Sequence, residues 1–160
     1  PRWEPHFKFQ LRIVYPLISG ATAGIIMGLL SDILFRLKTF RSSLLVVDGS
    51  FFFRTLKLQG TARLIYAAGL FIHLITSGVF GALYILLSAL LGFSATESVS
   101  LAAISIYVVL LWLSMLFVAL PVAGEGLLGR KSGPLTSFEQ LILHVIFLFV
   151  YYGCLRALLV

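Results

Sequence analysis

The sequence predicts an all-α membrane protein with four transmembrane helices in a bundle. Of its 160 residues, 60% are apolar and 11% are charged, and the mean hydropathy is +1.07. A soluble domain has about 45–50% apolar and about 25% charged residues, so this chain has too few charges to cover a water-facing surface. The charges are also spaced so that long uncharged stretches lie between them. These observations exclude a soluble enzyme and a disordered chain.

The predicted spans lie between charged residues. A helix needs about 20 residues to cross about 30 Å of hydrocarbon. Between Arg63 and Glu97 there are 33 uncharged residues, too few for two spans and a turn, so we expect one long helix there. The third span is expected to end at the stop signal from Pro121 to Gly124. Together these signals predict a single membrane domain over 1–160 with spans at about 12–36, 63–91, 98–123 and 136–159.

The connection 37–62 is the only long one, and we expect it to lie in the membrane interface. It contains an apolar run from Ser43 to Phe53 that is interrupted by Asp48-Gly49. An Asp-Gly pair between apolar runs is typical of a tight hairpin turn, and both arms are too short to cross a bilayer. The alternatives are therefore an interfacial hairpin and a short re-entrant segment buried in protein.

Lysine and arginine are distributed unequally between the two ends of the predicted helices. Eight lie in or beside the connections 37–62 and 124–135. The positive-inside rule then places both connections in the cytoplasm, and we expect a bacterial inner membrane. The remaining four, at the opposite end, are Arg2, Lys8, Arg12 and Arg156.

The net charge of +6 indicates contact with anionic lipid headgroups, and no nucleic-acid partner is expected. We expect the basic tip at Arg130 and Lys131 to bind lipid phosphates. The glycines around this tip resemble a phosphate-binding loop only superficially, because the preceding strand and the Gly-Lys-Ser/Thr ending are missing. The single cysteine, Cys154, excludes an internal disulfide and a cysteine-based metal site. Catalytic triads and metalloprotease motifs are absent, so no enzymatic activity and no metal site are expected.

Small residues recur at intervals of four in two of the predicted spans. The first span contains Gly20, Gly24 and Gly28, and the second contains Ser77 and Gly81. Residues four apart share one face of a helix, so the three glycines form a smooth strip that another helix can approach closely. The strip indicates either packing within the bundle or a docking face for another subunit. The two interpretations differ in whether the strip is buried in the isolated chain.

Two histidines lie inside predicted spans, where ionisable residues are costly. His73 and His144 are on helices that run in the same direction, and both lie roughly 12–15 Å from the same surface at 1.5 Å per residue. They could therefore face each other. Ser77 continues the helix face of His73, while Gln140 and Tyr151 continue that of His144.

Three explanations compete for these histidines. The first is hydrogen bonding to each other, to Ser77 or to the backbone, which alone could offset much of a burial cost of roughly 2–7 kcal/mol. The second is a b-type haem between His73 and His144, since neutral imidazoles on facing helices suit iron; no other cofactor is expected. The third is a proton or substrate path that also uses Asp32 and Glu139.

The second half of the chain resembles the YagU-type small inner-membrane proteins, over about 73–156. The resemblance implies a multi-span bundle with paired histidines, and it assigns no catalytic residue. It is carried by a helix with histidine and small residues, a proline-glycine helix end and a second histidine helix: His73-Leu-Ile-Thr-Ser-Gly-Val-Phe-Gly-Ala-Leu-Tyr84, Pro121 with Gly124, and Gln140-Leu-Ile-Leu-His144.

The function predicted first is a non-catalytic accessory or structural subunit of a larger membrane complex. Its small size, short connections and glycine strip favour packing against other membrane subunits, including neighbours that hold haem or pigment, within the lipid bilayer. The alternatives are a small b-type cytochrome and a small transporter or channel. A transporter predicts a polar cavity at the midplane, whereas a bundle packed solid around the histidines would rule against one.

Overall fold

The computed structural model describes the chain from Glu4 to Leu159, and the side-chain environments from Ile13 onward except at Ala95. Within this part of the chain all regular structure is helical, as predicted. The four predicted long helices are confirmed, with bounds that differ from the expected ones by a few residues. The helices long and apolar enough to cross a membrane are Ile13–Arg36, Ala62–Leu90, Leu101–Val122 and Thr136–Leu159.

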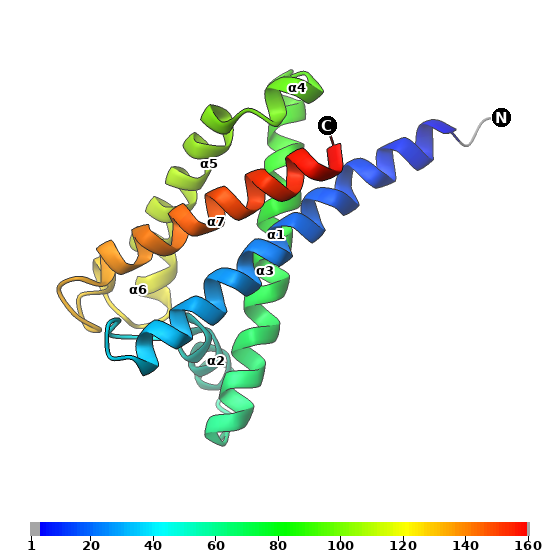
Figure 1. Ribbon diagram of the computed structural model, residues 1–160. Coiled ribbons are helices and arrows are strands. Elements are labelled where there is room, and N and C mark those ends of the chain that lie inside the picture. The colour runs from blue at the N-terminus through cyan, green and yellow to red at the C-terminus, as the bar shows by residue number, and fades with distance from the viewer. Residues whose placement is uncertain (1–3, 160) are drawn as a thin grey trace.

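The two longest helices, α1 (Glu4–Arg36) and α3 (Ala62–Leu90), cross like the arms of an X (Figure 1). Thr61 begins α3, because its side chain accepts a hydrogen bond from the backbone N–H of Leu64. The helix α7 (Thr136–Leu159) packs along α1 and also contacts α5 (Leu101–Ser114).

The third span is less regular than the single helix expected over 98–123. The short helix α4 (Ala95–Ser98) is followed by α5, by a π-helical turn at Met115–Ala119 and by α6 (Leu120–Val122). In the π turn the N–H of Leu120 bonds to the carbonyl of Met115, five residues back. The widening follows from Pro121, which has no N–H and whose ring excludes the carbonyl four residues earlier.

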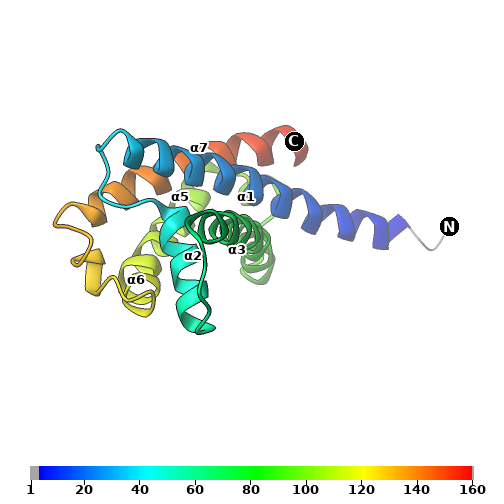
Figure 2. The same cartoon turned by 90° about the horizontal axis from the view of Figure 1, so that it is seen from below.

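The connection 37–62 is a correction to the sequence analysis. Residues Leu44–Thr55 form a helix, α2, so Asp48-Gly49 is no hairpin turn. The first turn of α2 is tied to α1 by a hydrogen bond of 3.0 Å from the N–H of Leu44 to Oγ of Ser31. Figure 2 shows α2 lying beside α3. The segment is therefore a short helix packed against α1 and α3, and the expected hairpin is wrong.

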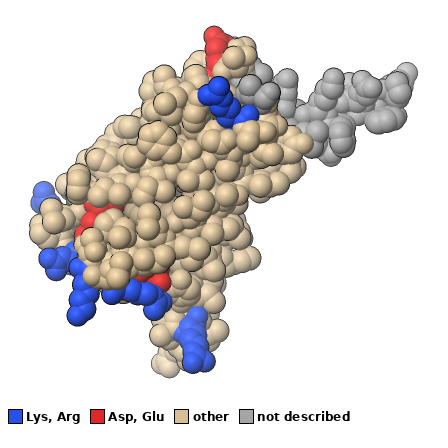
Figure 3. Space-filling view, in the orientation of Figure 1, with Lys and Arg blue, Asp and Glu red and all other residues tan. Residues whose placement is uncertain are grey.

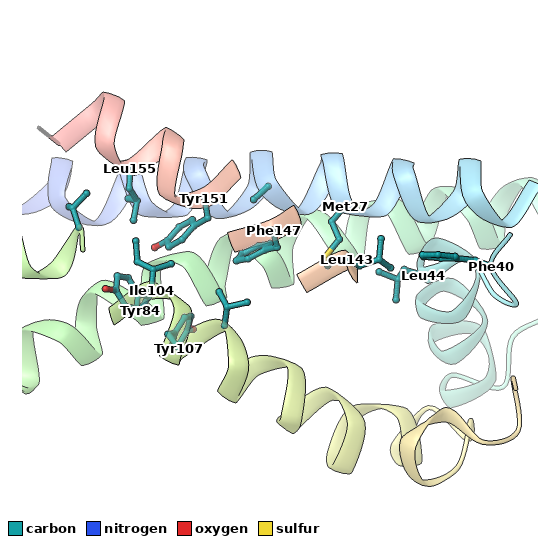
Figure 4. Close-up of a cluster of buried hydrophobic side chains, with 13 residues drawn as sticks. Met27, Phe40, Leu44, Tyr84, Ile104, Tyr107, Leu143, Phe147, Tyr151 and Leu155 are labelled. Atoms are coloured by element: carbon teal, nitrogen blue, oxygen red, sulfur yellow. The ribbon is translucent and has the colours of Figure 1, made fainter. Parts of the chain in front are cut away.

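Aromatic side chains form the part of the buried core that lies between α3, α5 and α7 (Figure 4). The ring centroids of Tyr84 and Tyr107 lie 5.1 Å apart, and those of Phe147 and Tyr151 lie 5.6 Å apart. Each tyrosine hydroxyl donates to a backbone carbonyl on another element; that of Tyr107, for example, bonds to Phe80 at 2.7 Å. Because each ring fills apolar space while its hydroxyl is satisfied, the cluster joins the three helices without burying an unpaired group.

Basic side chains gather at one end of the molecule, where α1 ends, α3 begins and the connection from α6 to α7 lies (Figure 3). That connection contains a 3-10 turn, Leu127–Gly129, and the exposed side chains of Arg130 and Lys131. Of the cations expected at the opposite end, Arg2 lies outside the described residues, and so do the side chains of Lys8 and Arg12.

Candidate functional site

The glycine strip of α1 packs against α3 of the same chain. Gly20, Gly24 and Gly28 are all buried. A Cβ added at Gly20 would collide with the backbone of Ser77, and one at Gly24 with the Ser77 side chain. A Cβ at Gly28 would lie 3.0 Å from a ring carbon of His73. The strip is thus covered within the isolated chain. It allows the backbone of α1 at Gly28 to lie against the ring of His73 in α3.

A partly open cavity of about 350 Å³ lies between α2, α3, α7 and the irregular third span. Its walls are mostly carbon, with three phenylalanines and two methionines among them: Phe51, Phe80, Phe147, Met27 and Met115. The polar residues in the lining include Asp48, His73, Ser77, Gln140 and His144. A space of this size with a few converging polar groups has the form of a small-molecule site.

The cavity has further hydroxyls whose hydrogen bonds stay within their own helices. Thr76 Oγ1 donates to the carbonyl of Ile72 at 2.9 Å, and Ser114 Oγ donates to that of Leu111 at 2.8 Å. Because these hydroxyls already donate to carbonyls of their own helices, they add little polarity to the cavity.

Asp48 and His73 form the most polar pair in the lining. Asp48 Oδ2 lies 2.9 Å from Nδ1 of His73, and the side chains are 30% and 9% exposed respectively. An ionised carboxylate can only accept, so Nδ1 carries the hydrogen and donates it. His73 Nε2 is buried beside Gly28 and has no hydrogen-bond partner among the described residues.

His144 enters the same cavity from α7. Its Nδ1 lies 2.8 Å from the carbonyl oxygen of Gln140, one helical turn earlier, so Nδ1 is again the donor. Its Nε2 is then an acceptor. The side-chain oxygen of Gln140 is buried without a partner among the described residues. The two histidines share one cavity, as their equal depth indicates, but in the described part of the chain no hydrogen bond joins them.

Haem between the two histidines does not fit this geometry. Coordination needs an open ring nitrogen on each side. In His73, Nδ1 is bound to Asp48 and Nε2 is closed in against Gly28. Over the described residues, no group of three or more His, Cys, Asp or Glu side chains could hold a metal ion.

Two acidic residues considered for a proton path do not line the cavity. Asp32 is paired with Arg36, whose Nε lies 2.6 Å from Oδ2, and Tyr66 approaches the same oxygen at 3.5 Å. Both oxygens of Glu139 accept from the backbone N–H of Arg41 at 3.2 Å. These carboxylates connect neighbouring elements, and the structure does not bring them together with the histidines.

Of the remaining predicted site residues, one lines the cavity and the others lie outside it. Ser77 lines the cavity, whereas Gly81 lies at the crossing of α1 and α3. Tyr151 is fully buried and its hydroxyl donates to the Gly81 carbonyl at 2.6 Å, so it belongs to the core and not to the cavity. At the rim, the guanidinium of Arg54 donates to the carbonyl of Ala123.

Asp48 is the site residue that the sequence analysis missed, since it was assigned to a turn. The available signal was its position in an otherwise apolar run, where an ionisable residue needs a partner. Read with helical spacing, that run places Leu44, Asp48 and Phe51 on one face. All three line the cavity.

Comparisons with protein-family models, with curated proteins and with solved structures found no match. The site is therefore interpreted from its own chemistry.

Proposed function

We propose that the chain is an integral membrane protein that binds a lipid-soluble small molecule in the cavity between α2, α3, α7 and the third span. Its four long helices insert as one membrane domain, with the basic end in the cytoplasm. The single observation that carries the proposal is the cavity of about 350 Å³, which has a mostly apolar lining that includes Asp48, His73 and His144.

Membrane insertion is supported by the outer surface of the helices. Large apolar side chains face outward on the third and fourth spans: Ile106 is 65% exposed, Val118 is 59% exposed and Phe149 is 59% exposed. An apolar surface this extensive is rare on soluble monomers but natural in lipid.

Ligand binding is favoured over a purely structural role by two features. The glycine strip, which suggested a docking face, is already covered by α3, so it offers no support for a partner. The space around the histidines is open instead of packed solid. A protein whose only task is packing has no need of a cavity with a carboxylate in its wall, because an unfilled cavity costs stability.

The proposal is tested by filling the cavity. Purified chain in detergent is mixed with N-phenyl-1-naphthylamine, a neutral apolar probe, and the one-to-one adduct is measured by native mass spectrometry. Ala119→Phe places a ring at the cavity lining and should abolish the adduct. Val118→Phe adds a ring at the adjacent, outward-facing position and should leave it unchanged. Equal adducts in both variants would show that the probe binds elsewhere.

A further inference from the structure

We infer that the ligand of this cavity is a lipophilic cation, an amine or a quaternary onium ion with an apolar body, held by the carboxylate of Asp48. The inference rests on the proposed function and specifies its ligand.

The first argument is charge. Asp48 has one hydrogen-bond partner, Nδ1 of His73, and no lysine or arginine lies within ion-pair distance of it among the described residues. Among the described residues, Asp48 is the one carboxylic acid in the lining of the cavity, and that lining holds no lysine or arginine. A carboxylate in an apolar, membrane-embedded space is costly, and a cation bound beside it offsets that cost.

The second argument is the character of the walls. Phe51, Phe80 and Phe147 line the space, and an aromatic ring attracts a cation that lies over its face. Met27 and Met115 add polarisable, adaptable surface for an apolar body. An organic cation with hydrophobic substituents combines the two properties that these walls recognise.

The third argument is the polarity of the remaining groups. The Nε2 of His144 is an acceptor, and the buried side-chain oxygen Oε1 of Gln140 has no hydrogen-bond partner among the described residues. Both could accept from the N–H groups of an amine. No lysine or arginine lines the cavity, so an anionic ligand would meet the charge of Asp48 with nothing to oppose it.

The test compares two ions of nearly equal shape and opposite charge. Binding of radiolabelled tetraphenylphosphonium and, in a separate experiment, of tetraphenylborate to the chain in phosphatidylcholine nanodiscs is measured against empty nanodiscs. We expect saturable binding of the phosphonium to the chain and none of the borate. This comparison uses the unaltered chain, so it does not depend on any variant folding.

Two variants then locate the binding. Asp48→Asn keeps the shape and an acceptor for His73 but removes the charge, and we expect it to weaken phosphonium binding about tenfold or more. The matched control is Asp32→Asn, which makes the same substitution at an aspartate outside the cavity and should change binding little. Thermal unfolding of both variants checks that they remain folded.

The outcomes separate the two proposals. Equal affinity for both ions, or unchanged binding in Asp48→Asn, overturns the cationic ligand; the proposed function then stands only if Ala119→Phe still blocks the neutral probe. Failure of the phosphonium and of the neutral probe together overturns both.

Discussion

Gly49 of α2 and Gly69 of α3 lie backbone against backbone, and neither position has room for a side chain. A Cβ added at Gly49 would collide with the carbonyl oxygen of Ile65, and one at Gly69 would collide with a carbonyl of α2. This contact seats α2 on α3 and thereby holds Asp48 at 2.9 Å from His73. Two residues that do not line the cavity thus determine its most polar feature.

The glycine contact predicts that Gly69→Ala displaces α2 from α3. We expect a loss of about 1–3 kcal/mol of stability, because the added methyl group has no space and the backbones must separate. Binding of tetraphenylphosphonium should weaken in parallel. Thermal unfolding in detergent measures the first effect, and the nanodisc assay measures the second.

The matched control is Gly153→Ala in α7, where a new Cβ meets nothing within 4 Å. Alanine is favoured over glycine in a helix by roughly 0.5–1 kcal/mol, so this variant should be as stable as the unaltered chain or more so. Similar destabilisation at both positions would argue against a specific contact at Gly69.

The tyrosine core predicts that Tyr151→Phe costs about 1 kcal/mol, the usual net value of one hydrogen bond. The lost bond is the one from the hydroxyl to the Gly81 carbonyl, at 2.6 Å. Tyr152→Phe removes a hydroxyl that only accepts from the Arg156 side chain at the surface, and its effect should stay within about 0.5 kcal/mol. Chemical unfolding of the two variants side by side gives the difference; equal losses would contradict the structural role of Tyr151.

The loop at α4 predicts a measurable titration. Hydrogen bonds from the side chain and then the backbone N–H of Ser94 hold the pKa of Glu97 below its ordinary value of 4.5. The stabilisation is present above that ordinary value and is lost as the pH falls through the lowered pKa. In Ser94→Ala we expect the pKa to rise toward 4.5, which ¹³C NMR of the carboxyl group can follow. An unchanged pKa would show that the hydrogen bonds between Ser94 and Glu97 are not formed in solution.

The closed environment of His73 Nε2 predicts that the chain does not bind haem through both histidines. Titration of purified protein with haem should give no Soret band of the bis-imidazole type, since one of the two ligands has no open nitrogen. The contrary result is a band that disappears in both His73→Ala and His144→Ala.

Much of the fold could be predicted because span length and charge spacing are strong signals. The four long helices follow from stretches of apolar residues that fit the thickness of a bilayer. The connection 37–62 could not be predicted in the same way. Asp48-Gly49 is locally a turn signal, but the backbone contact with Gly69 makes the glycine part of a helix crossing. That contact joins residues far apart in the sequence, and no local pattern contains it.

The sequence predicted only part of the candidate site, because the rest depends on contacts between residues far apart in the chain. Counting residues placed His73 and His144 at one depth, and both line one cavity. The face of a helix on which a residue lies is harder to infer from the sequence than its position along the helix axis. Tyr151 shares the predicted face of His144 but lies in the core, while Glu139 turns to the backbone of Arg41. The acid that does reach the cavity comes from α2, whose helical form was not expected.

The position of Asp48 on α2 has a consequence for how the site is assembled. This helix has 12 residues, too few to cross a bilayer, and it packs against α1 and α3. The binding site is therefore complete only when α2 is docked on those two helices. A ligand that contacts Asp48 binds only the docked form, and by mass action it shifts the docking equilibrium toward completion. Amide exchange in α2 should therefore slow when the cavity is occupied, which makes this short helix a reporter of ligand binding.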